Sequence, residues 1–161
     1  MITGLAHVAV CVPDIEAAVA WYTDVLGLRL LSPPYRIEGD AITRDMGELV
    51  PGPPVVLVAA IIGLDDGDHV LEVIEYPEVA GAAPSGPPLL TDHGLTHVGL
   101  VCDDVAATRA DLEAKGVEFL TSEPADVAGV RTTWFRDPWG VVFILVQKRK
   151  PDRPYWRQFG S

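Results

Sequence analysis

An internal repeat constrains the fold of this chain more than any other feature of its sequence. Residues 4–31 read GLAHVAVCVPDIEAAVAWYTDVLGLRLL, and residues 94–121 read GLTHVGLVCDDVAATRADLEAKGVEFLT. When His7 is aligned with His97, several Gly, Leu, Val, Asp and Ala residues of the two segments also coincide. Such self-similarity indicates that one structural unit occurs twice. A chain of 161 residues can bury a sizeable core for two such units.

The two repeats predict the same series of elements. A β-branched run that carries a His predicts a strand, an Asp then caps a helix of about ten residues, and a Gly ends that helix before another strand. Further strands are predicted within residues 54–63, within 68–77, and after the turn in 137–149. The polar segment 35–52, flanked by Pro and Gly, is predicted to be a loop.

These elements predict an α+β fold with two similar halves that together form one functional domain. The first module is expected at residues 1–77 and the second at residues 93–148. Residues 78–92 are rich in Pro, Gly and Ala, which is typical of a linker. Residues 149–161 form a basic and then aromatic C-terminal tail.

Charge and cysteine content exclude several classes of function. With 12 Lys and Arg against 23 Asp and Glu, the net charge is −11, which repels nucleic acids and anionic lipid surfaces. No apolar run is long enough to span a membrane, and the first residues lack the basic segment of a secretory signal. Cys11 and Cys102 lie in apolar runs and are expected to be reduced core thiols. We therefore expect a cytoplasmic protein that binds neither nucleic acid nor membrane.

Three polar side chains interrupt strands that otherwise favour burial. They are His7 in AHVAV, Glu72 in VLEVI and His97 in THVGL. A buried ionised Glu is costly unless it is paired or binds a cation, whereas a single His in such a run is commonly a hydrogen-bonded core residue. Two imidazoles and one carboxylate form a ligand set that suits Fe, Mn, Co, Ni or Zn and leaves coordination positions open. The sequence does not choose among these divalent metal ions.

Strand alternation assigns the neighbouring polar residues to other surfaces. Glu75 and Gln147 lie at odd offsets from the candidate positions on their strands and are expected on the opposite face. His69 should likewise face away from Glu72, and His93 should be exposed at the end of the linker. Of Trp134 and Phe135, one should face the same side as the candidate site.

The phrase DIEAAVAWYTDVLGLRLL, the repeat GLTHVGLVCDD and the late DPWG turn together resemble the vicinal oxygen chelate superfamily. This superfamily includes glyoxalase I, methylmalonyl-CoA epimerase, extradiol dioxygenases and the fosfomycin and bleomycin resistance proteins. The resemblance covers about residues 4–148. It implies two tandem βαβββ modules that form a curled mixed sheet around a shared cleft.

The resemblance also implies where metal ligands lie, because metal-binding members supply them from the first and last strands of each module. Carried over to this chain, those positions fall on His7, Glu72 and His97. The fourth falls on Ile144, where many family enzymes have a Glu. Ile cannot bind a metal, so we expect three ligands and an apolar wall of the substrate cleft at Ile144.

The leading hypothesis is a metal-dependent isomerase, epimerase or lyase that acts on a small carbonyl or hydroxy-carbonyl compound through an enolate-like intermediate. Glu72 would be the catalytic residue that moves the proton. One alternative is an oxygen-activating dioxygenase with a 2-His-1-carboxylate metal. Another is a non-enzymatic protein that sequesters a drug, as resistance proteins do. In each case the partner is a small molecule, and we expect a twofold homodimer.

Overall fold

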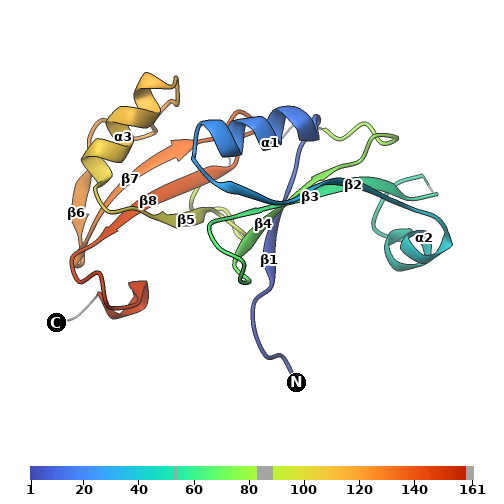
Figure 1. The fold of residues 1–161 in the computed structure, drawn as a ribbon, viewed down its shortest axis with the longest axis horizontal. Coiled ribbons are helices and arrows are strands. Elements are labelled where there is room, and N and C mark those ends of the chain that lie inside the picture. The colour runs from blue at the N-terminus through green and yellow to red at the C-terminus, as the bar shows by residue number, and fades with distance from the viewer. Residues whose placement is uncertain (53, 83–88, 159–161) are drawn as a thin grey trace. The chain divides into compact units, whose positions relative to one another are not determined.

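The computed structural model describes residues 1–52, 54–82 and 89–158, and the chain divides into two compact units, Met1–Ala82 and Ala83–Ser161 (Figure 1). Part of the predicted linker, residues 83–88, and the last three residues of the predicted tail lie outside the described residues. In the described part of the chain, no helix has the length and apolar character needed to cross a membrane.

The first unit is a four-stranded mixed sheet with one long helix on a face. Its elements are β1 (His7–Cys11), α1 (Ile15–Asp24), β2 (Arg29–Glu38), α2 (Asp40–Met46), β3 (Val56–Gly63) and β4 (Val70–Glu75). The strand order is β1-β4-β3-β2, with β1 parallel to β4 and the other pairs antiparallel. The helix α1 lies along the sheet (Figure 1) and buries Ile15, Ala18, Val19 and Tyr22.

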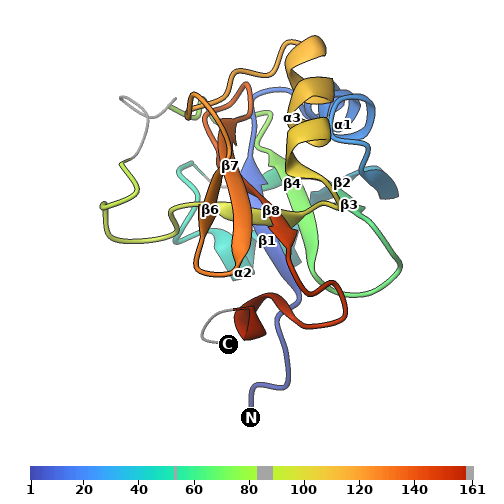
Figure 2. The same cartoon turned by 90° about the vertical axis from the view of Figure 1, so that its left-hand side faces the viewer.

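The second unit repeats this topology. Its elements are β5 (Val98–Val101), α3 (Val105–Ala114), β6 (Ala125–Val127), β7 (Val130–Arg136) and β8 (Val142–Lys148), followed by a short 3₁₀ turn at Tyr155–Arg157. The order is β5-β8-β7-β6, again with the first strand parallel to the last, and α3 runs along this sheet (Figure 2). Two four-stranded mixed sheets of the same order confirm the predicted α+β fold with two similar modules.

Both long helices begin and end where the sequence predicts. Asp14 Oδ1 accepts a hydrogen bond from the backbone N–H of Ala17 at 3.0 Å. Asp104 Oδ1 does the same for Ala107, also at 3.0 Å. These carboxylates satisfy donors that a helix start leaves free. Beyond the helix ends, Gly27 and Gly116 adopt φ of 70° and 87°, which glycine tolerates best.

A second side chain supports the start of each helix. Glu75 Oε2 accepts from the N–H of Ile15 at 2.9 Å, and Gln147 Oε1 accepts from the N–H of Val105 at 3.1 Å. Each acceptor comes from the last strand of its own unit. The prediction that Glu75 and Gln147 face away from the candidate site is therefore confirmed, because both point towards the helix.

The prediction of a loop at residues 35–52 is wrong. The strand β2 runs on to Glu38, and α2 follows at Asp40–Met46. The sequence pattern does not reveal this strand, because its pairing with β3 is irregular. Register shifts occur between Leu30 and Ser32 and between Ser32 and Tyr35. The two prolines of this strand fall in the second irregularity, where an edge strand tolerates the missing N–H.

The expectation that both cysteines are core thiols is also wrong. Cys11 is exposed and Cys102 is only partly buried, and both are free thiols. Strand alternation turns Cys11 away from the helix face, on which Val10 and Val12 are buried. Partial burial raises the pKa of Cys11, and the negative charge of Glu75 raises it further. Cys11 is therefore a protonated thiol at neutral pH.

Candidate functional site

The candidate site of the first unit lies on the sheet face opposite α1. The parallel pairing of β1 with β4 sets Ala9 beside Glu72, and alternation then places His7 on the same face as Glu72. His7 Nε2 is 3.3 Å from Glu72 Oε2. The His7 side chain is 49% exposed and that of Glu72 is 20% exposed. The structure thus brings two of the three predicted ligands together and leaves them accessible.

Tyr76 is a neighbour of this pair that the sequence analysis missed. It follows the end of β4 and shares the alternation phase of Glu72. Partial burial raises the pKa of Tyr76, and it is raised further by the negative charge of the Cys11 thiolate, which forms only at high pH, and by that of Glu72. The phenol therefore stays protonated at neutral pH and can donate a hydrogen bond beside the carboxylate. Its phase relative to Glu72 was the sequence signal that could have identified it.

The candidate site of the second unit is built around His97. The His97 and Trp134 rings meet edge to face, with centroids 4.9 Å apart and an interplanar angle of 75°. His97 Nδ1 lies 2.8 Å from Thr96 Oγ1. In the tautomer whose Nδ1–H donates to Thr96, His97 Nε2 keeps its lone pair for a cation.

Ile144 occupies in the second sheet the position that Glu72 occupies in the first. It pairs with Gly99, two residues after His97, just as Glu72 pairs with Ala9, two residues after His7. Trp134 is its partner on the other side, in β7. Ile144 is 8% exposed and packs with Val130, Val146 and Trp134. Trp134 is therefore the aromatic residue on the candidate face, while Phe135 is buried on the α3 side.

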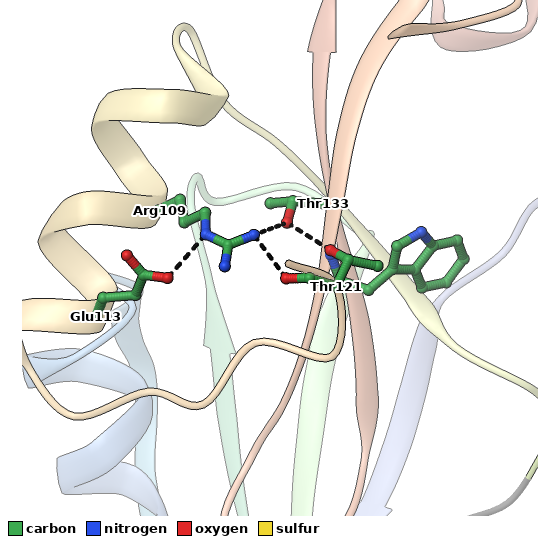
Figure 3. A network of polar contacts seen from close by, with 5 residues as sticks. Arg109, Glu113, Thr121 and Thr133 are labelled. Atoms are coloured by element: carbon green, nitrogen blue, oxygen red, sulfur yellow. Dashed lines mark hydrogen bonds and ion pairs between the residues drawn. The ribbon is translucent and has the colours of Figure 1, made fainter. Parts of the chain in front are cut away.

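A polar network on the α3 side fixes the strand that carries Trp134 (Figure 3). Arg109 of α3 donates from Nη1 to the Thr121 carbonyl at 2.8 Å and to Thr133 Oγ1 at 3.0 Å. Its Nε donates to Glu113 Oε1 at 2.8 Å. The Thr121 and Thr133 hydroxyls are 3.0 Å apart. The helix, the segment after it and β7 are thereby tied together directly behind Trp134.

The donor set fits a divalent metal ion in its chemistry. Imidazole nitrogen and carboxylate oxygen are ligands that such ions accept, and the His7–Glu72 pair presents both on one accessible face. Within each unit, no group of three or more described His, Cys, Asp or Glu side chains is arranged around a metal position. His97 belongs to the second unit, so the convergence of all three ligands stays a prediction. His69 and His93 are exposed, as expected.

Comparison with known proteins decides the family. A model of the Glyoxalase/Bleomycin resistance protein/Dioxygenase superfamily matches residues 4–145. The chain belongs to this superfamily. The match spans both units and every residue of the candidate site, including His7, Glu72, His97 and Ile144.

Individual members of the superfamily resemble the chain along most of its length. The uncharacterized protein YaeR of Escherichia coli is 27% identical, with 88% of this chain and 94% of that protein covered. The 2-epi-5-epi-valiolone epimerase of an Actinomyces species is 32% identical, with 87% and 76% covered. A glyoxalase family protein from Bacillus cereus has the same fold, with a TM-score of 0.77 at 17% identity, and the match covers 92% of this chain and 95% of that one.

Proposed function

We propose that this superfamily member is a metal-dependent isomerase, epimerase or lyase that acts on a small carbonyl or hydroxy-carbonyl compound. The observation that carries the proposal is the His7–Glu72 pair, because it sets a ligand nitrogen 3.3 Å from a carboxylate oxygen on an accessible face. The similarity to an epimerase along most of the chain supports the reaction class.

In this proposal His7, Glu72 and His97 hold a divalent cation, whose identity among Fe, Mn, Co, Ni and Zn is open. When bound, the cation would polarise the substrate carbonyl and so acidify the neighbouring C–H group. Glu72 takes the proton from that carbon, which leaves an enolate-like intermediate, and returns it to the adjacent carbon in an isomerisation. Epimerisation at the same carbon would need a second acid that delivers a proton from the opposite face. The neutral phenol of Tyr76 donates a hydrogen bond to the oxygen on which negative charge develops.

Metal analysis of the freshly purified protein tests the ligand set. We expect a stoichiometric divalent metal that is lost in the double variant His7→Ala with His97→Ala. Metal binding stabilises the folded state, so the same variant should lose the rise in melting temperature that added metal produces. His69→Ala is the matched control, because His69 is an exposed histidine of the same unit. Stoichiometric metal retained in the double variant would refute the site.

Solvent deuterium exchange tests the reaction class. The probe is 2-epi-5-epi-valiolone, and NMR in heavy water follows the incorporation of deuterium next to its carbonyl. Glu72→Gln should lower the exchange rate at least 100-fold, which is the usual scale of general acid–base catalysis. Glu118→Gln removes a charge from an exposed site and should leave the rate unchanged. Bound iron with oxygen uptake would instead favour a dioxygenase, and ligand binding without metal would favour a sequestering protein.

A further inference from the structure

We propose that Arg136 is the residue that binds an anionic group of the substrate, so that the substrate class is a small oxygenated compound bearing a carboxylate or a phosphate. The inference rests on the proposed function, since it takes the face that carries His97 as part of the site. Two observations support it. Arg136 lies on the same face of the second sheet as His97, and its buried Nε has no hydrogen-bond partner among the described residues.

Arg136 lies on the candidate face of the second sheet. It alternates in phase with Trp134, which contacts His97, and out of phase with Phe135, which is buried on the α3 side. Arg136 pairs with Val142 in β8. Because Val98 pairs with Phe143, the preceding His97 falls beside Val142. The residues His97, Val142 and Arg136 therefore form one row across three neighbouring strands.

One donor of the Arg136 guanidinium group lacks a partner. Arg136 Nε is buried and has no hydrogen-bond partner among the described residues. The adjacent carboxylate, Asp137, turns Oδ1 to the backbone N–H groups of Trp139 and Val141, at 3.0 and 2.8 Å. A buried charged donor without an acceptor is more costly than a neutral one, so such a group needs an explanation. An anionic ligand would supply the missing acceptor.

Several other arginines of the chain form ion pairs with carboxylates, whereas Arg136 does not. Arg29, Arg36, Arg109 and Arg149 each form an ion pair with an Asp or Glu. Acidic residues outnumber basic ones by 23 to 12, so carboxylates are abundant as partners for cations. Among the ion pairs of the described residues, Arg136 takes part in none. It differs from the other arginines without an ion pair, because its buried Nε also lacks a hydrogen-bond partner among the described residues.

The surroundings of Arg136 favour recognition of an anion. Val142, in the same row, is 3% exposed, and Ile144, two residues further along the strand on the same face, is 8% exposed. These buried apolar neighbours weaken the screening of the Arg136 charge. The planar fork of an Arg side chain matches the two oxygens of a carboxylate or phosphate. In a chain of net charge −11, a local cationic side chain favours the binding of an anion at this face.

Side-chain NMR of the chelator-treated protein tests this assignment. The probes are acetate and inorganic phosphate, titrated while the ¹⁵N-labelled arginine Nε–H signals are recorded. We expect the Arg136 signal to shift with at least one probe, and the stronger probe identifies carboxylate or phosphate as the preferred group. Binding should weaken about tenfold or more in Arg136→Gln, which corresponds to the loss of one charge-assisted contact.

The matched control is Arg131→Gln, because Arg131 is an exposed arginine of the same strand on the opposite face. Arg136→Lys keeps the positive charge but lacks the planar guanidinium group, so it should also weaken anion binding. This variant replaces Arg136→Gln in the experiment if the Gln variant does not fold. If neither anion shifts the Arg136 signal, or if Arg136→Gln and Arg131→Gln bind equally well, the inference is overturned. The protein is metal-free in this experiment, so its result is independent of whether the metal analysis supports the proposed function.

Discussion

Ile144 shows at the scale of one residue how the two sheets differ, because Glu72 holds the same position in the first sheet. Replacing Ile144 with Glu should add a fourth ligand, and we expect tighter metal binding with lower turnover. Without metal the new carboxylate is buried and unpaired, so the variant should lose more than about 1–3 kcal/mol of unfolding free energy. Competition with a chelator and the melting temperature with and without metal measure both effects.

Ile144→Val is the control for that experiment, because it changes the volume of the side chain without adding charge. It should leave metal affinity as it is and cost about 0.5–1.5 kcal/mol of stability. A metal affinity of Ile144→Glu equal to that of the native chain would mean that position 144 does not adjoin the metal.

Strand alternation accounts for what the sequence predicted at this scale and for what it missed. Alternation correctly turned Glu75 and Gln147 away from the candidate face, and the polar interruptions of apolar strands identified His7 and Glu72, which lie 3.3 Å apart. Alternation gives the side of a sheet but not the burial on that side. The exposure of Cys11 and the buried Nε of Arg136 depend on which segments cover each strand, and these come from distant parts of the chain.

At the scale of elements, the side-chain acceptors at the starts of α1 and α3 can be compared, because one is the Glu75 carboxylate and the other the Gln147 amide. Glu75→Ala leaves the N–H of Ile15 without its acceptor, and we expect a loss of about 1 kcal/mol of unfolding free energy. Glu75→Gln should lower the unfolding free energy by only about a few tenths of a kcal/mol, because the Gln147 amide performs the same role for α3. Urea unfolding measures both, with Glu78→Ala as an exposed control. Equal losses for the Ala and Gln variants would contradict this role of the side chain.

The Arg109 network is expected to contribute more than an exposed ion pair. Arg109→Met removes the donor to the Thr121 carbonyl and to the fully buried Thr133 hydroxyl, so we expect a loss of about 2–3 kcal/mol in urea unfolding. Arg29→Met breaks the ion pair with Asp66, in which the Arg29 side chain is 60% exposed and that of Asp66 is 90% exposed. It should change the unfolding free energy by less than about 1 kcal/mol. A loss for Arg109→Met no larger than that of Arg29→Met would contradict the structural role of the network.

Helices and strands with strong local signals were predictable, whereas β2 was not. The Asp caps and the glycines with positive φ determine where α1 and α3 begin and end. In β2 the side-chain period is broken by two register shifts, so the alternation that identifies a strand is lost from the sequence. The pairing with β3, whose residues lie 18 to 34 positions later, keeps this stretch extended.

At the scale of the whole molecule, the open edges of the two sheets predict self-association. Within its own unit each four-stranded sheet ends in two edge strands, β1 and β2 in the first and β5 and β6 in the second. Such edges are commonly covered by another surface, and a twofold dimer covers them with a single kind of contact. We expect light scattering at micromolar concentration to give the mass of two chains. A mass of 17.3 kDa at that concentration would contradict the dimer.

The pairing of the first strand of each unit with its last has a consequence for synthesis on the ribosome. While the chain emerges, β1 has no neighbour until β4 has left the exit tunnel, because His7 pairs with Val70. The first sheet can therefore close only after nearly half of the chain has emerged from the tunnel, yet before β5 has emerged. Since Val98 in turn waits for Phe143, each half matures as a separate event, and the newborn protein passes through a stage with one finished half and one unfinished half.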